Sequence, residues 1–370
     1  MDKSMLSIAC LFGLSISYWP VVAEESRPAP YEIIAELEHG PGNVAVGPTG
    51  RIIFSLHQMY SPDINVMELM ADGTTRPYPS EAWARPPNGE EELGTHAVLG
   101  VVIDQNQTLW LLDNASSPPR LIAWDMKNER LKRIYPLSSG SYTPKNTMIN
   151  DLAVNLSDKK VYIADIFGDQ GAGLIVVDIQ TGDVRTVLRG HKSTSAELDS
   201  DLIIGGRGLR MKTDAEIITP KIGVNPITID SQNKYVYYGA MHGTSIYRIP
   251  TSALNDETLS PSQLKKTIER FGDKPVSDGI SIDEAGNVYV TDLQGYGIGV
   301  TAPNGKYRRL FTDRDTFIWP DGLSTAPKGT IVGTINQLNR SAPLNAGYDE
   351  SKPPFYIYRF NAIADVKIGR

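Results

Sequence analysis

The 370-residue chain has a single cysteine, Cys10, which lies in an apolar N-terminal stretch. If that stretch is removed on export, the mature protein has no disulfide bond, thiolate metal site or cysteine nucleophile. Basic charge is also scarce, because 36 Lys and Arg against 43 Asp and Glu give a formal net charge of −7. Nucleic-acid binding requires a basic surface that neutralises phosphates, so this balance argues against a nucleic-acid partner.

Long apolar runs are missing as well. Serines and Pro20 interrupt the N-terminal stretch, and no later segment is apolar enough to span a membrane. Residues 1–23 instead have the layout of a secretory signal peptide, with Lys3, an apolar stretch and the small residues Val21 and Ala23 before the cleavage point. We therefore expect a secreted or periplasmic protein without a membrane span, and a monomer.

What the sequence does have is an internal repeat. Six segments, which begin at residues 42, 99, 150, 225, 278 and 321, share a short strand, a polar turn and a second alternating strand. A third strand follows each copy and a fourth follows five of them, while a spare strand, "YEIIAELE" (31–38), precedes the first copy. The pattern predicts an all-β protein, a six-bladed β-propeller closed by an N-terminal strand.

Residues 24–370 are expected to form this single domain. Two β-sandwich domains would need a linker, and no Pro/Ser-rich or charge-biased break divides the chain. The longest interruption, residues 189–223, lies between the third and fourth copies. It contains apolar runs of its own and predicts an insertion that carries an extra hairpin over one face.

In a propeller, the first residue of each innermost strand faces the mouth of the central channel. Four consecutive blades place an amide or an acid there: Asn150, Asn225, Asp278 and Asp321. Oxygen ligands that converge on one axis suit a hard cation, so Asn150, Asn225 and Asp278 are a candidate metal site, for Ca²⁺ rather than Zn²⁺. Asn and Asp also form turns and cap strand ends, which leaves a purely structural role open.

The ends of the second strands should reach the same face. Asp recurs there as Asp113, Asp165 and Asp292, which predicts a hydrogen-bonding role within the blades. His57 and His242 do not recur as a set, so we take each as a candidate ligand-binding residue beside the four amide and acid positions.

Four passages carry a resemblance to a known family. "GNVAVGPTGRIIFSLHQMYSPDINVMEL" (42–69), "NDLAVN" (150–155), "NPITIDSQNKYVYYGAMHGTSIYRIPTSAL" (225–254) and "SDGISIDEAGNVYV" (277–290) resemble the yellow / major royal jelly protein family. The likeness covers most of the mature chain. It implies a secreted six-bladed propeller whose members bind small molecules, including amines, at the mouth of the channel.

More distantly, Asn225-Pro226 and Asp278-Gly279 resemble gluconolactonase and regucalcin-type propellers. In those proteins a divalent metal, held by a Glu, Asn and Asp set, polarises a lactone carbonyl and activates water. Asn150, Asn225 and Asp278 match the amide and acid positions. The Glu is not matched, because His39 directly precedes the Gly-Pro pair.

Three functions therefore stay open, and with them the question whether the protein is an enzyme. The first is binding of a small organic ligand, cationic or polyhydroxylated, by Asn150, Asn225, Asp278 and Asp321. The second is a metal-dependent lactonase or related hydrolase, with Asp321 as the candidate general base. The third is a protein-interaction platform that uses the insertion at 189–223.

Overall fold

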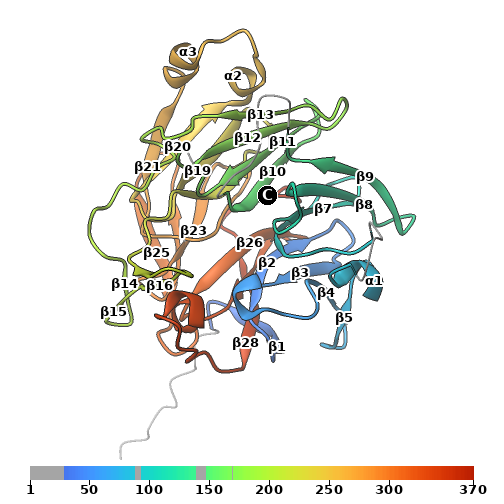
Figure 1. The fold of residues 1–370 in the computed structure, drawn as a ribbon, viewed down its shortest axis with the longest axis vertical. Coiled ribbons are helices and arrows are strands. Elements are labelled where there is room, and N and C mark those ends of the chain that lie inside the picture. Colours follow the sequence, from blue (N-terminus) through green and yellow to red (C-terminus); the bar gives the residue numbers. More distant parts are fainter. Residues whose placement is uncertain (1–28, 88–92, 139–146, 169) are drawn as a thin grey trace, which may run out of the picture.

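The computed structural model describes residues 29–87, 93–138, 147–168 and 170–370, so the predicted signal peptide lies outside the described residues. Six four-stranded antiparallel sheets surround a common centre, as Figure 1 shows. The first strand of each sheet contacts the first strands of both neighbouring sheets, and the last sheet contacts the first. This closed ring confirms the predicted six-bladed β-propeller.

In the first five blades the strands follow one another outward in chain order, and in the sixth the outermost strand is the N-terminal β1. The innermost strands are β2 (Pro41–Val46), β6 (Val98–Ile103), β10 (Ile149–Asn155), β18 (Val224–Ile229), β22 (Ile280–Ile282) and β26 (Pro320–Ala326). The second strands are β3 (Ile52–Leu56), β7 (Thr108–Asp113), β11 (Lys160–Asp165), β19 (Tyr235–Ala240), β23 (Val288–Asp292) and β27 (Thr330–Ile335). The third strands are β4 (Val66–Leu69), β8 (Arg120–Asp125), β12 (Gly173–Asp178), β20 (Ser245–Pro250), β24 (Gly297–Thr301) and β28 (Phe355–Asn361). The outermost strands are β5 (Thr75–Pro77), β9 (Arg130–Pro136), β13 (Val184–Val187), β21 (Glu269–Asp273), β25 (Tyr307–Thr312) and β1 (Glu32–Leu37).

The N-terminal strand closes the ring as predicted. β1 pairs antiparallel with β28 and becomes the outer strand of the sixth blade. Ala35 and Leu37 of β1 are buried, in the same core cluster as Phe355 and Ile357 of β28. The first and last strands of the propeller are thus joined in one sheet, and the outward-facing edges of the blades are the short outer strands.

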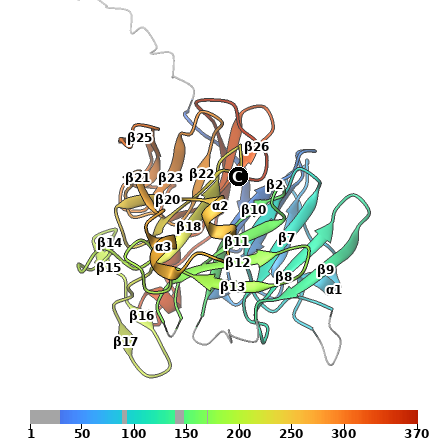
Figure 2. The ribbon, with the colours of Figure 1, turned by 90° about the horizontal axis from the view of Figure 1, so that it is seen from above.

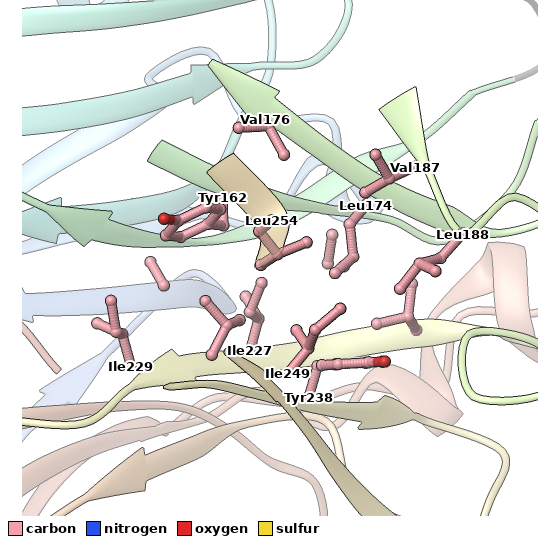
Figure 3. Packing of buried hydrophobic residues seen from close by; sticks show 14 of the residues in the cluster. Tyr162, Leu174, Val176, Val187, Leu188, Ile227, Ile229, Tyr238, Ile249 and Leu254 are labelled. Atoms are coloured by element: carbon pink, nitrogen blue, oxygen red, sulfur yellow. The ribbon is translucent and has the colours of Figure 1, made fainter. Parts of the chain in front are cut away.

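Blades are held together mainly by apolar side chains on their facing surfaces. Figure 3 shows one such layer between the third and fourth blades, where Tyr162 and Leu174 lie opposite Ile227 and Tyr238. Leu254 from the short helix α2 (Thr251–Asn255) is also fully buried in this layer. Each such side chain contributes about 1.5–3 kcal/mol through its removal from water.

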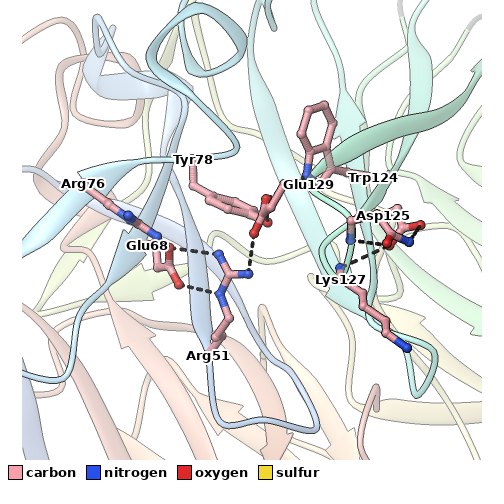
Figure 4. A network of polar contacts seen from close by, with 9 residues as sticks. Arg51, Glu68, Arg76, Tyr78, Trp124, Asp125, Lys127 and Glu129 are labelled. Carbon is pink, nitrogen blue, oxygen red and sulfur yellow. Dashed lines mark hydrogen bonds and ion pairs between the residues drawn. The ribbon is translucent and has the colours of Figure 1, made fainter.

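A polar network joins the first two blades. Arg51, in the turn after β2, donates to Glu68 of β4 at 2.6 Å and to Glu129 of the second blade at 2.8 Å (Figure 4). Tyr78 donates to the other oxygen of Glu129 at 2.8 Å. The Arg51 guanidinium also lies 4.6 Å from the centre of the Tyr78 ring.

The insertion and the helices lie outside the sheets. Between β13 and β18 the chain forms two short hairpins, β14 (Ile203–Ile204) with β15 (Arg207–Gly208) and β16 (Met211–Lys212) with β17 (Ile217–Ile218). Figure 2 shows the β16–β17 hairpin projecting from one side of the propeller. The helical turns are η1 (Gln58–Tyr60), α1 (Glu81–Ala84), α3 (Pro261–Lys265), η2 (Leu338–Arg340) and η3 (Ala342–Leu344). Among the described residues, no helix has the length and apolar character needed to cross a membrane.

Candidate functional site

The innermost strands share an irregularity where they open on the predicted channel mouth. In five blades the pairing with the second strand shifts register directly after its first residue pair, as between Val224 and Ile227. In the fifth blade β22 begins later, and Thr291 Oγ1 instead accepts hydrogen bonds from the backbone N of Asp278 and Gly279, at 2.9 and 3.0 Å. The residues predicted for the mouth therefore lie outside the regular ladder, and a β-bulge of this kind redirects side chains.

The glycine after Asp278 has a steric reason. A Cβ at Gly279 would overlap the backbone carbonyl of Asp321 in the next blade. A Cβ at Gly322 would likewise overlap Asn43 of the first blade, at its side-chain oxygen and its Cα. The Asp-Gly pairs therefore reflect the close approach of neighbouring innermost strands near the axis, and this approach brings Asp278 and Asp321 to one place.

Five of the six predicted ligand-binding residues line one small cavity at this end of the channel, with a volume of about 40 Å³. They are His57, Asn150, Asn225, Asp278 and Asp321. We call this space the mouth cavity. Its volume admits a water molecule or a small cation, but not a drug-sized ligand.

The polar side chains of the mouth cavity form a chain of hydrogen bonds. Asn150 Nδ2 donates to Asn225 Oδ1, and Asn225 Nδ2 donates to Asp278 Oδ1 at 2.5 Å. Trp319 Nε1 donates to the other Asp278 oxygen at 2.7 Å, and Asn336 Nδ2 donates to Asp321 Oδ2. Both carboxyl groups are thus oriented by neutral donors.

Both acids have a pKa above the usual value for an aspartate. Burial raises the pKa of Asp278 to about 6, and burial together with the nearby charge of Asp278 raises the pKa of Asp321 well above its usual value. Neither acid forms an ion pair with any residue that the structure describes. A cation in the mouth cavity would therefore find two carboxyl groups without a counter-ion.

The nearest buried cation is Lys274. Its Nζ donates to the carbonyl oxygens of Gly243 and Pro275, at 2.9 and 3.1 Å. Burial lowers the pKa of this lysine to about 7, against the opposing charges of Glu197 and Asp278. Lys274 does not line the mouth cavity.

An apolar collar, which the sequence did not predict, surrounds the mouth cavity. It consists of Met59, Met148, Ile166, Phe167, Met211, Ile222, Met241, Trp319, Leu338 and Leu344. Met211 and Ile222 belong to the insertion, and Leu338 and Leu344 to the helical turns of the sixth blade. No periodic pattern marks these residues, because most of them lie in connections between strands and come together only in the folded protein.

The two predicted histidines are placed differently. His57 lines the mouth cavity, and its Nδ1 accepts the backbone N–H of Met59 at 3.1 Å. Burial lowers the pKa of His57 to about 4, so the ring is neutral at physiological pH. His242 is buried but does not line the cavity; its backbone carbonyl accepts from Glu197 and Leu198 of the insertion.

One functional candidate escaped the sequence reasoning. Asp151, directly after Asn150, is buried and accepts hydrogen bonds from Asn43 Nδ2 and from its neighbour's backbone N, both at 2.9 Å. It lines a second cavity of about 20 Å³ deeper in the channel, together with Arg370. The sequence signal for Asp151 was its position directly after Asn150. The register shift between Ile149 and Leu152 lets both side chains face the axis.

The recurring second-strand acids have the predicted role within their blades. Asp113 accepts from the backbone N of His96 and Ala97 and pairs with Arg120 at 2.8 Å. Asp165 bonds Arg189 of its own blade, and Asp292 bonds Tyr307 and Arg309 of its own blade.

The oxygen donors at the mouth meet only part of what a divalent cation needs. The described residues contain no group of three or more His, Cys, Asp or Glu side chains placed to hold a metal ion. Two carboxylates and two amides are oxygen donors of the right type for Ca²⁺, which takes six to eight oxygens. The remaining ligands would have to be water or substrate.

The sequence of the chain matches the family model for major royal jelly proteins over residues 96–358. The chain belongs to the major royal jelly protein family. No curated protein matches this family member significantly.

Solved structures with the same fold include a gluconolactonase from Xanthomonas campestris, at 10% identity and a TM-score of 0.56, covering 89% of this chain and 88% of that one. A second protein assigned as a gluconolactonase has 12% identity and a TM-score of 0.55, with coverage of 91% and 94%. A luciferin-regenerating enzyme has 12% identity and a TM-score of 0.51, with coverage of 92% and 99%. Likeness at this level of identity establishes the propeller fold for this royal jelly family member, and nothing about its chemistry.

Proposed function

We propose that the protein binds a small organic amine whose ammonium group lies between Asp278 and Asp321 at the mouth of the channel. The observation that carries this proposal is the pair of buried acids on adjacent blades that line one cavity without an ion-pair partner among the described residues. An ammonium group supplies the missing positive charge and three hydrogen-bond donors.

The collar suits the rest of such a ligand. The mouth cavity has room for the ammonium head alone, so the carbon skeleton must displace collar side chains. Met59, Met148 and Met211 are unbranched and flexible, and methionine surfaces repack readily around ligands of different shape. Phe167 and Trp319 add aromatic surface beside them.

Isothermal titration calorimetry with tyramine and its uncharged analogue 4-ethylphenol tests the proposal. Tyramine should bind at least tenfold more tightly than 4-ethylphenol. Asp278→Asn or Asp321→Asn should weaken the binding of tyramine at least tenfold. Asp151→Asn is the matched control, because it removes a buried channel carboxyl that lines the deeper cavity. Equal affinity for the two ligands, or an equal loss in all three variants, would contradict an amine site at the mouth.

Proton release gives a second readout of the same site. The pKa values of both acids are raised in the free protein, and a bound ammonium group favours the carboxylate form. Binding should therefore release protons near pH 6, where Asp278 titrates, and tyramine affinity should rise as the pH is raised from 5 to 8. The same titration in buffers of different ionisation enthalpy measures the number released.

A metal-dependent hydrolase is the second candidate, favoured by the all-oxygen donor set. Asn150, Asn225, Asp278 and Asp321 would hold the cation, and a bound divalent cation would supply a Lewis acid for lactone hydrolysis. Burial and the nearby charge of Asp278 raise the pKa of Asp321 well above its usual value, so this carboxyl group is less often ionised than an exposed aspartate and is less available as a general base. A thermal shift with CaCl₂ that disappears in Asp278→Asn would support this candidate; no shift, with tyramine still bound, would exclude it.

We also propose that the protein is exported, on the layout of residues 1–23 and on its membership of the major royal jelly protein family. The mature N-terminus should then begin at Glu24. Mass spectrometry of the protein recovered outside the cytoplasm checks this expectation.

A further inference from the structure

A cavity of about 750 Å³ lies on the outer side of the collar. Its walls are the β14–β15 hairpin, Tyr296 and Arg314 of the fifth blade, and the segment 339–352 of the sixth; we call it the outer cleft. Leu338 and Leu344 face the mouth cavity, whereas the adjacent Asn339 and Arg340 face the outer cleft. Figure 1 shows the insertion hairpins beside the red helical turns that form this partition. The volume is in the range of sites that hold small organic ligands.

The charge of the outer cleft is opposite to that of the whole molecule. It is lined by four cations, Arg207, Arg314, Arg340 and Lys352, and by two acids, Asp349 and Glu350, whereas the chain carries −7 overall. Both acids are already engaged. Glu350 pairs with Arg207, and Asp349 accepts from the backbone N and the hydroxyl of Ser351 at 3.0 and 2.5 Å.

Three of the cations have no acidic partner. Among the described residues, no carboxylate lies within ion-pair distance of Arg314, Arg340 or Lys352. The Arg314 guanidinium lies 5.0 Å from the centre of the Tyr296 ring, and Arg340 donates only to Gln337, at 3.2 Å. Arginine presents a planar set of donors that matches carboxylate, phosphate and sulfonate oxygens.

Hydrogen bonds from two glutamine side chains connect the walls of the outer cleft. Gln337 donates to the carbonyl of Lys352 at 2.7 Å and also bonds Arg340, which couples two of the cations. Gly205 and Gly206, with φ of 62° and 77°, form the two-residue turn of the β14–β15 hairpin. Gln294 donates to the carbonyl of Ile203 at 3.1 Å and ties that hairpin to the fifth blade.

We propose that the outer cleft binds a small organic anion: a carboxylate, phosphate or sulfonate with an apolar or aromatic body. Arg314, Arg340 and Lys352 receive the anionic group. Ile204, Ile318 and the Tyr296 ring receive the body. This site is separate from the mouth cavity and selects the opposite charge, so the proposal does not depend on the amine site.

Calorimetry at low salt with naphthalene-2-sulfonate, benzoate and phenyl phosphate tests the proposal, with naphthalene-2-methanol as the uncharged analogue. At least one anion should bind, and its affinity should fall as salt is raised. The double variant Arg314→Gln/Arg340→Gln should weaken that anion at least tenfold. Arg308→Gln, an exposed arginine of β25 without an ion pair, is the matched control and should stay within twofold.

Three results would overturn the outer cleft as an anion site: no binding of any of the three anions, equal affinity for the alcohol, or unchanged affinity in the double variant. The two sites can fail independently. Tyramine affinity should be unaffected by the arginine variants, and anion affinity by Asp278→Asn.

Discussion

At the scale of single residues, the channel concentrates buried acids whose pKa values are raised. Asp151, Asp278 and Asp321 follow one another down and around the axis, and each has a pKa raised first by burial. The charge of Asp278 raises the pKa of the other two further. A buried carboxyl group with a raised pKa lowers the stability of the folded protein once the pH exceeds that pKa. Of the three, only Asp278 and Asp321 line the mouth cavity.

Asp151→Asn should make the protein more stable at high pH and leave it unchanged at low pH. Burial raises the pKa of Asp151 to about 7, against a value near 4 in the unfolded chain. The stability from this bound proton is therefore complete below pH 4 and is lost as the pH rises through 7. Asn keeps both hydrogen bonds, since Asn43 and Leu152 donate to the same oxygen.

The expected gain at pH 8 is on the order of 2–4 kcal/mol in the free energy of unfolding. Urea denaturation of both proteins at pH 4, 6 and 8 measures it. A difference that does not change with pH would show that the pKa of Asp151 is not raised in the folded protein.

The second-strand acids show the opposite use of the same residue type. Asp113 and Asp292 are as buried as the channel acids, yet each is paired with an arginine of its own blade. Aspartate therefore has a structural role at the end of the second strand and, among the described residues, forms no ion pair at the start of the innermost strand of the repeat. The presence of the arginine decides between the two.

At the scale of elements, β1 closes the ring, because it pairs with β28 and completes the sixth blade. Its inward side chains belong to the core of the sixth blade, while Glu36 points to solvent.

Leu37→Ala should lower the free energy of unfolding by about 2–3 kcal/mol, because the buried side chain packs on β28 and leaves a cavity. Glu36→Ala, the next residue on the opposite face, should change it by less than about 0.5 kcal/mol. Thermal and urea unfolding of the two variants side by side measure the contrast. Equal, small effects would mean that β1 is not needed to close the ring.

At the scale of the whole molecule, the six blades form the ring, and the insertion packs over the mouth of its channel. No strand of the six blades comes from the insertion, yet Leu202, Ile204 and Leu209 are buried in the same cluster as Trp319 and Leu344. The insertion thus makes the mouth cavity small and builds one wall of the outer cleft.

Replacing residues 201–220 by a short Gly/Ser linker should leave a folded propeller with an open mouth. The ends are close, since Lys221 Nζ donates to the carbonyls of Leu198 and Ser200 at 3.2 and 3.1 Å. Far-UV circular dichroism should be nearly unchanged, binding of a hydrophobic dye should rise, and the Trp319 environment should become more polar. Loss of cooperative unfolding would show that the propeller needs the insertion in order to fold.

Much of this architecture follows from the sequence alone. The six repeats, the N-terminal closing strand and the register that puts Asn150, Asn225, Asp278 and Asp321 at one end of the channel are properties of period-two alternation and of the repeat. The anchoring role of Asp113, Asp165 and Asp292 follows in the same way. A repeated local pattern fixes where each residue lies in its blade, and the closed ring then fixes where the blades lie.

Only the tertiary structure decided the rest. The collar, the volume of the mouth cavity, the position of His242 beneath the insertion and the charge of the outer cleft depend on how residues 189–223 and 337–352 pack. The sequences of those segments have no repeating apolar pattern. Because the hydrophobic effect has no directional preference, the residues that their apolar side chains contact depend on how the surfaces fit together and not on spacing in the sequence. The unpaired state of Asp278 and Asp321 is decided in the same way, because no local sequence signal shows which charges lie nearby.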